Sequence, residues 1–148
     1  MALATDIDLM NDETAHPRKK ILVVDDNEII LKAISTKLER AGYETFVAFD
    51  GGEAVDVALR ERLDLIVVDV NFAPDVYGEA WDGFQIMERL WEHDCARNVP
   101  FIAISSREDE QDRERVQKFG VAAFFHKPIG HADLLAVIKE TLLALPVA

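Results

Sequence analysis

The chain has 148 residues, which suits one domain with a single substantial core. Its composition, 49% hydrophobic and 30% charged, is ordinary for a globular protein in water. The formal net charge of −12 argues against binding to DNA, RNA or an anionic membrane through the overall field, but it is compatible with a partner that has a basic surface.

The first elements follow a stretch without any sustained hydrophobic period, so we expect a flexible leader at residues 1–18 and one domain at 19–148. An apolar run at residues 21–24, rich in branched side chains, is typical of a strand buried on both faces of a sheet. Apolar residues then recur at helical spacing over 28–40, and Gly42 is the expected cap that ends this helix.

Strands and helices continue to alternate along the rest of the chain. Asp50, followed three residues later by Glu53, predicts a helix start through a capping box. The remaining strands are predicted from short apolar runs and the remaining helices from apolar residues at helical spacing. In order, we predict a strand at 43–49, a helix from about 50 to 62, a strand at 65–68, a helix at 84–91, a strand at 101–104, a helix at 109–119, a strand at 121–125 and a helix at 131–143.

This alternation predicts an α/β fold with helices on both faces of a parallel sheet. Because crossovers between parallel strands are right-handed, few topologies remain. We predict a doubly wound, five-stranded parallel sheet of the flavodoxin-like (βα)5 type, with strand order 2-1-3-4-5. Such sheets bind ligands outside the carboxyl ends of their strands, at the point where the strand order reverses.

Polar side chains lie where four of the predicted strands end. Three carboxylates brought to one edge repel one another unless a cation joins them. Oxygen ligands without His or Cys select Mg²⁺ or a similar ion such as Mn²⁺. The residues concerned are Asp25 and Asp26 after the first strand, Asp69 after the third, Ser105 after the fourth and Lys127 after the fifth.

The same set of side chains suits in-line phosphoryl transfer, in which positioning and charge stabilisation do most of the catalysis. Lys127 offers a positive charge and Ser105 a hydroxyl donor to phosphoryl oxygens, and a carboxylate can serve as the nucleophile. Each residue alone has a simpler explanation: Asp25 and Asp26 as helix caps, Asp69 as a loop carboxylate, and the other two as turn or surface residues. Their convergence at one sheet edge favours a functional site.

With these motifs in place, residues 20–143 resemble the receiver domain of two-component response regulators. The order, the spacing and the residue types all agree with that family. The matching segments are 21–26, 65–70, 82–83, 104–106 and 125–129.

The resemblance implies a phospho-acceptor and a metal site. Asp69 falls at the position of the family's phosphorylated aspartate. Asp25 and Asp26 match its acidic metal-binding pair, so that Asp25, Asp26, Asp69 and the backbone carbonyl of Asn71 would bind Mg²⁺. The phosphoryl donor would be a sensor histidine kinase, a histidine phosphotransfer protein or a small phosphodonor.

The resemblance also implies a switch. Ser105 and Lys127 would hold the new phosphoryl oxygens, and Ser105 would move toward the phosphate while Phe124 turns inward behind it. The changed face would bind a downstream protein not named by the sequence. The family often has a cis peptide before the proline that here is Pro128. Such a protein is not an enzyme in the usual sense, because it catalyses only its own phosphorylation and dephosphorylation.

The chain departs from the family in the loop at 70–82, which is about six residues longer than expected. The loop either forms a lid or partner contact beside Asp69, or is a tolerated surface insertion, since lengthening a loop costs little. Asn71 and Arg107 occupy positions that, in the family this chain resembles, tune the lifetime of the phosphoryl group. Ala122 and Ala123 replace the acidic residue common before the switch aromatic in the DNA-binding branch, so we expect a monomer or a weak dimer.

The remaining expectations concern location and output. The single cysteine excludes an internal disulfide, and we find neither a signal peptide nor an apolar run long enough to span a bilayer, so we expect a cytoplasmic protein. We expect a stand-alone domain that contacts no nucleic acid or membrane and acts through protein contacts. A phosphorylation-independent module is one alternative. An aspartyl-phosphate hydrolase is another, although such enzymes usually carry Asp-x-Asp after the first strand, where this chain has two adjacent aspartates.

Overall fold

The computed structural model describes residues 18–70, 83–93, 98–105 and 110–144. Its centre is a five-stranded sheet in which neighbouring strands are parallel and the order is β3-β2-β4-β5-β6. Numbered along the chain, this is the order 2-1-3-4-5, so the predicted fold class is confirmed. The strands are β2 (Lys20–Val24), β3 (Glu44–Ala48), β4 (Leu65–Asp69), β5 (Phe101–Ser105) and β6 (Ala123–His126).

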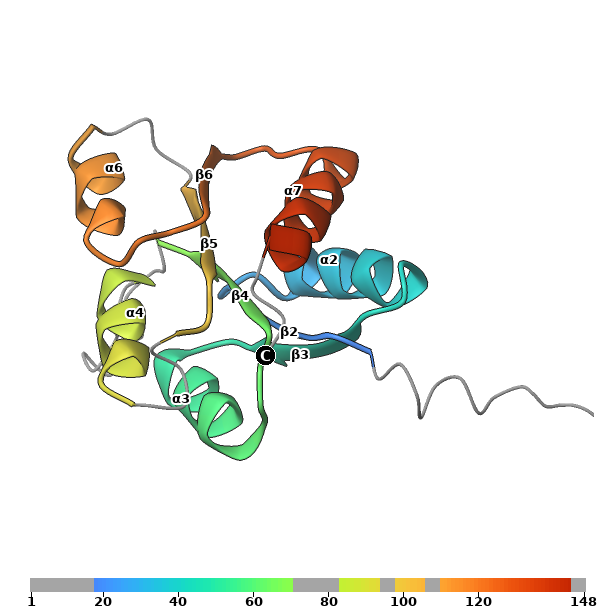
Figure 1. The fold of residues 1–148 in the computed structure, drawn as a ribbon, viewed down its shortest axis with the longest axis horizontal. Coiled ribbons are helices and arrows are strands. Elements are labelled where there is room, and N and C mark those ends of the chain that lie inside the picture. Colours follow the sequence, from blue (N-terminus) through green and yellow to red (C-terminus); the bar gives the residue numbers. More distant parts are fainter. Residues whose placement is uncertain (1–17, 71–82, 94–97, 106–109, 145–148) are drawn as a thin grey trace, which may run out of the picture.

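Helices cover both faces of this sheet (Figure 1). Within the described residues, two helices pack on one face and three on the other, and each face has its own layer of buried apolar side chains. The first pair is α2 (Glu28–Arg40) and α7 (His131–Ala144); the other three are α3 (Gly51–Arg60), α4 (Gly83–Trp91) and α6 (Glu110–Gln117).

The central strands are apolar throughout because both of their faces are covered. In β2, Ile21 and Val23 pack in the layer with α2 and α7, whereas Leu22 and Val24 pack in the opposite layer. Successive side chains of a strand point to opposite faces, so a strand between two helical layers needs an unbroken apolar run. The same pattern makes β4 and β5 fully buried.

The predicted helix signals lie where the helices start and stop. The Asp50 carboxylate accepts a hydrogen bond from the Glu53 N–H at 2.8 Å, and the Glu53 side chain accepts one from the Phe49 N–H at 2.7 Å. These bonds satisfy backbone donors that a helix start leaves free. Gly42, just after α2, has φ of +101°, a conformation that favours glycine over residues with a Cβ.

Most predicted strand boundaries differ by one or two residues from the observed ones, and strand pairing accounts for two of these differences. We expected the last strand at 121–125, but β6 covers Ala123–His126, because it pairs with the stretch of β5 from Ile102 to Ser105. The first strand gains Lys20, which pairs with Glu44 of β3. Ladder length is thus set by the partner strand rather than by the apolar run alone.

Several expectations fall on other parts of the chain. Residues 1–17 of the leader predicted at 1–18 lie outside the described residues, as do Arg107 and most of the long loop with Asn71. In the described part of the chain, every helix is too short or too polar to cross a membrane.

Candidate functional site

Three buried polar side chains lie where adjacent strands end. Asp25 directly follows β2, Asp69 is the last residue of β4 and Ser105 is the last residue of β5. Their exposed fractions are 3%, 5% and 0%. Burial of polar groups is costly unless they have polar partners, so this edge of the sheet is built for polar contacts. The predicted convergence of these three residues is confirmed.

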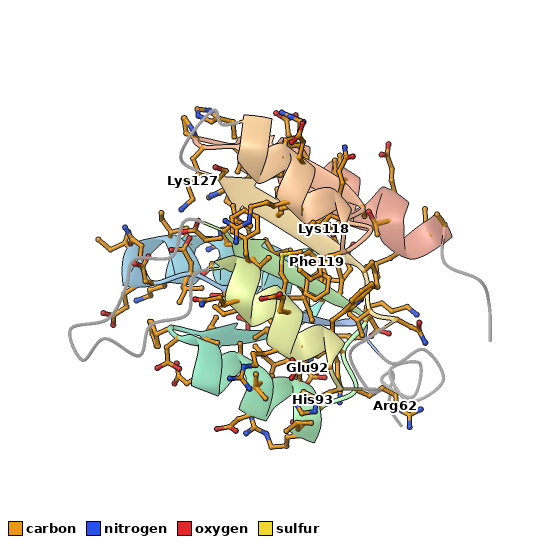
Figure 2. The ribbon with its side chains drawn as sticks, turned by 90° about the vertical axis from the view of Figure 1, so that its left-hand side faces the viewer. Arg62, Glu92, His93, Lys118, Phe119 and Lys127 are labelled. Atoms are coloured by element: carbon orange, nitrogen blue, oxygen red, sulfur yellow. The ribbon has the colours of Figure 1, made fainter. Side chains whose placement is uncertain are left out.

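Lys127, just after β6, provides the positive charge. Its Nζ lies 3.1 Å from Asp25 Oδ2 and 3.1 Å from Asp69 Oδ2, so the ammonium bridges the two buried carboxylates. The Lys127 N–H donates to the Ser105 carbonyl at 2.7 Å, which continues the pairing of the two strands beyond β6. The Lys127–Pro128 peptide is cis, as the family resemblance led us to expect. Figure 2 shows Lys127 at one end of the domain, away from Glu92 and His93 near the end of α4.

Asn27 orients Asp25 and starts the following helix. The Asn27 side chain accepts hydrogen bonds from the N–H groups of Ile29 and Ile30, which makes it the N-cap of α2. Its own N–H donates to Asp25 Oδ1 at 2.9 Å. The alternative that Asp25 or Asp26 is merely the cap of this helix is therefore wrong, because Asn27 has that role. An Asn just before the first helical turn is a known cap signal, and it was overlooked in the sequence.

The carboxylates of Asp25, Asp26 and Asp69 form a group that suits a metal ion. One oxygen from each lies within 4.8 Å of the others, with Asp25 and Asp69 buried and Asp26 exposed. The donors are all oxygens, the type of ligand that Mg²⁺ and Ca²⁺ take in proteins. An exposed aspartate beside two buried ones leaves the site open on one side to water or a substrate.

Neighbouring charges and burial shift the pKa values of Asp25 and Lys127. Burial raises the pKa of Asp25, and the charge of Asp69 raises it further, against the opposing effects of the Asn27 N–H and Lys127. Burial lowers the pKa of Lys127, but the charges of Asp69 and Asp25 outweigh this effect, so that the pKa of Lys127 is raised. Lys127 is thus held by two carboxylates that are themselves crowded together at this edge of the sheet.

Replacing Asp25 by asparagine should stabilise the domain when no divalent ion is present. When the pKa of a carboxyl group is raised in the folded state, the protein becomes less stable as the pH rises from the ordinary aspartate pKa through the folded value. At neutral pH the ionised Asp25 therefore opposes folding. Asparagine keeps an acceptor for the Asn27 N–H. In chelator at pH 7 we expect the free energy of unfolding to rise by about 1 kcal/mol, the lower end of what replacing buried ionic groups can bring.

Denaturant unfolding of Asp25→Asn at several pH values checks this expectation. The gain should disappear as the pH falls below the ordinary aspartate range, where the wild-type carboxyl is protonated in both states. Asp56→Asn, an exposed aspartate on α3, is the matched control and should change little at any pH. If Asp25→Asn were less stable than the wild type at pH 7, the attraction between Asp25 and Lys127 would contribute more to the free energy of unfolding than the repulsion between the carboxylates takes away.

A family model for the response regulator receiver domain matches residues 21–139. The chain belongs to this receiver-domain family. The receiver domain is 33% identical over 124 residues to the polar-differentiation response regulator DivK of Brucella anthropi, in a match that covers 84% of this chain and 96% of that protein.

Solved structures agree with this assignment. The chemotaxis response regulator CheY4 of Vibrio cholerae superposes with a TM-score of 0.73 at 26% identity, over 83% of this receiver domain and 98% of CheY4. The receiver domain of the sensor histidine kinase PA1611 of Pseudomonas aeruginosa superposes with a TM-score of 0.74 at 27% identity, over 86% and 99% of the two chains. The PA1611 structure has a magnesium ion coordinated in its active-site cleft.

The receiver domain also has contacts that sequence patterns did not reveal. Arg113 of α6 lies over the ring of Phe124 in β6, with 4.8 Å between the guanidinium carbon and the ring centroid. The sequence predicted a helix at 109–119, and most residues of α6 are charged, a type of side chain that is usually solvated. Helical spacing alone does not indicate which arginine of α6 reaches a ring on the neighbouring strand.

Proposed function

We propose that this receiver domain accepts a phosphoryl group on Asp69 and thereby switches a protein-binding face in a phosphorelay. The observation that carries the proposal is the position of the Asp69 carboxylate at the end of β4. It is buried, 3.1 Å from the Lys127 ammonium, and within 4.8 Å of the carboxylates of Asp25 and Asp26. An anionic nucleophile, a cation and a metal-binding group thus meet at one point.

In the proposed step, a carboxylate oxygen of Asp69 attacks the phosphorus of a phosphohistidine on a sensor histidine kinase or a histidine phosphotransfer protein. The new P–O bond forms as the P–N bond breaks, and the imidazole nitrogen leaves with the electron pair. Lys127 compensates negative charge on the phosphoryl oxygens, and the Ser105 hydroxyl donates a hydrogen bond to one of them. The domain acts only on itself, so it is a switch rather than an enzyme with turnover.

The metal site fits the same chemistry. We propose that Asp25, Asp26, Asp69 and the backbone carbonyl of Asn71 hold Mg²⁺ or Mn²⁺, with Asp25 acting through a water molecule. When bound, the ion would neutralise carboxylate charge and orient the phosphoryl oxygens of the donor. The three carboxylates provide the oxygen-only donor set that this role needs.

The proposed output uses Ser105 and Phe124. Ser105 is fully buried at the end of β5, and Phe124 is half-buried on β6, the edge strand beside it. On phosphorylation, Ser105 would move toward the phosphoryl group and Phe124 would turn inward, changing the face formed by α6, β6 and α7. Such a two-state face would bind a downstream protein in one state better than in the other.

Treatment of the domain with a small acyl-phosphate donor tests the proposed function. We expect intact mass spectrometry to show the gain of one phosphoryl group per chain in Mg²⁺, and at least about a hundredfold slower gain in chelator, because metal-mediated charge stabilisation contributes several kcal/mol. Free phosphate is measured in parallel. Steady release from a phosphate ester without a stable adduct would instead support a hydrolase, and no adduct in folded, Mg²⁺-bound protein would support a phosphorylation-independent module.

A further inference from the structure

Helix α6 places a cation over the ring of Phe124. The 4.8 Å between the Arg113 guanidinium carbon and the ring centroid is within the range at which a cation is attracted by the face of an aromatic ring. The two side chains line the same open pocket of about 350 Å³ between α6 and β6. Figure 1 shows α6 beside this edge of the sheet.

A second arginine of the same helix provides a comparison. The guanidinium carbon of Arg115 lies 3.7 Å from the centroid of the Phe84 ring at the start of α4. Phe84 is only 2% exposed and belongs to the core, so its ring has little room to move. The Arg115 contact therefore joins α6 to a core ring of α4.

Phe124 differs because its ring is half-buried on an edge strand. It packs against the margin of the core layer that contains α3, α4 and α6, and it borders the open pocket. Phenylalanine has no hydroxyl group that could anchor it by a hydrogen bond. The position of this ring is therefore set by packing and by contacts to its face, and Arg113 makes such a contact.

We propose that Arg113 is a positioning residue that holds Phe124 outward while Asp69 is unphosphorylated. The inference rests on the proposed function, because it takes Phe124 as the switch aromatic. When the ring turns inward behind Ser105, it leaves the guanidinium, so the contact exists in only one of the two states. An interaction made in one state alone shifts the equilibrium toward that state, and Arg113 thus opposes activation until the phosphoryl group is in place.

Two predicted effects follow from removing the guanidinium in Arg113→Gln. The ratio of outward to inward Phe124 should fall about two- to fivefold, the range expected for one exposed cation–ring contact. Because coupling between two sites is reciprocal, the affinity of the domain for beryllofluoride with Mg²⁺, a mimic of the phosphoryl group, should rise by up to the same factor.

NMR of the unphosphorylated domain measures the first effect through the χ1 rotamer populations of Phe124, and a beryllofluoride titration measures the second. Arg115→Gln is the matched control, since it removes a cation–ring contact of the same helix from a ring that is buried in the core. Arg113→Lys keeps the charge and should restore part of the outward population. Helical content and unfolding are followed in all variants.

Either of two results would overturn the proposal. In one, Arg113→Gln leaves the Phe124 rotamers as in the wild type; in the other, Arg115→Gln shifts them equally, which would indicate general loosening of α6. Failure of the proposed function looks different. In that case the wild type would not bind beryllofluoride at all, while the rotamer populations of the unphosphorylated domain would still report on Arg113.

Discussion

Replacing Asp69 by asparagine is expected to abolish phosphoryl uptake, slowing it at least about a thousandfold, which corresponds to about 4 kcal/mol in the barrier. The amide is neutral and a poor nucleophile, whereas the carboxylate it replaces is an anion beside a cation at 3.1 Å. Asparagine has nearly the same size and keeps an oxygen that can accept from Lys127. We therefore expect Asp69→Asn to fold like the wild type although it no longer accepts a phosphoryl group.

Intact mass after treatment with an acyl-phosphate donor in Mg²⁺ measures the loss. Asp56→Asn is the matched control, because it makes the same chemical change on the exposed side of α3 and should take up one phosphoryl group like the wild type. An Asp69→Asn protein phosphorylated at the wild-type rate would place the acceptor elsewhere, and fragment masses would then locate it. Unfolding measured alongside shows that the variant is folded.

Much of the fold could be predicted because its signals are local. The apolar runs of β2 and β4, each ended by an aspartate, are what a strand between two helical layers requires. The cap formed by Asp50 and the positive φ of Gly42 likewise depend on residues close in sequence. Handedness rules then left few topologies, and the common flavodoxin-like strand order among them is the one observed.

Contacts between distant segments were harder to predict. The sequence placed Lys127 near Asp25 and Asp69, but the two 3.1 Å distances depend on where the chain runs just after β6, where the Lys127 N–H donates to the Ser105 carbonyl. The Arg113–Phe124 contact joins a polar helix to an edge strand, and no periodic pattern marks it. Arg113 is exposed and still lies over this ring, a combination that a charged stretch of sequence does not indicate.

Replacing Lys127 by methionine is expected to lower the free energy of unfolding by about 3 kcal/mol in chelator at neutral pH. Methionine keeps much of the apolar stem but leaves the carboxylates of Asp25 and Asp69, both almost fully buried, without their shared cation. Because the pKa of Lys127 is raised in the folded state, its contribution to stability is complete below the ordinary lysine pKa and is lost as the pH rises through the folded value. The difference between wild type and variant should therefore shrink in strong alkali.

Denaturant unfolding of Lys127→Met with and without Mg²⁺ also tests whether the lysine and the metal act on the same charges. If they do, Mg²⁺ should bind the variant more tightly than the wild type and restore much of its lost stability, since the ion no longer competes with an ammonium group for Asp25 and Asp69. Lys139→Met, an exposed lysine on α7, should leave both quantities unchanged. A variant destabilised equally with and without Mg²⁺ would mean that the ion does not neutralise the carboxylates that Lys127 bridges, and the metal site would then have to lie apart from the ion pair.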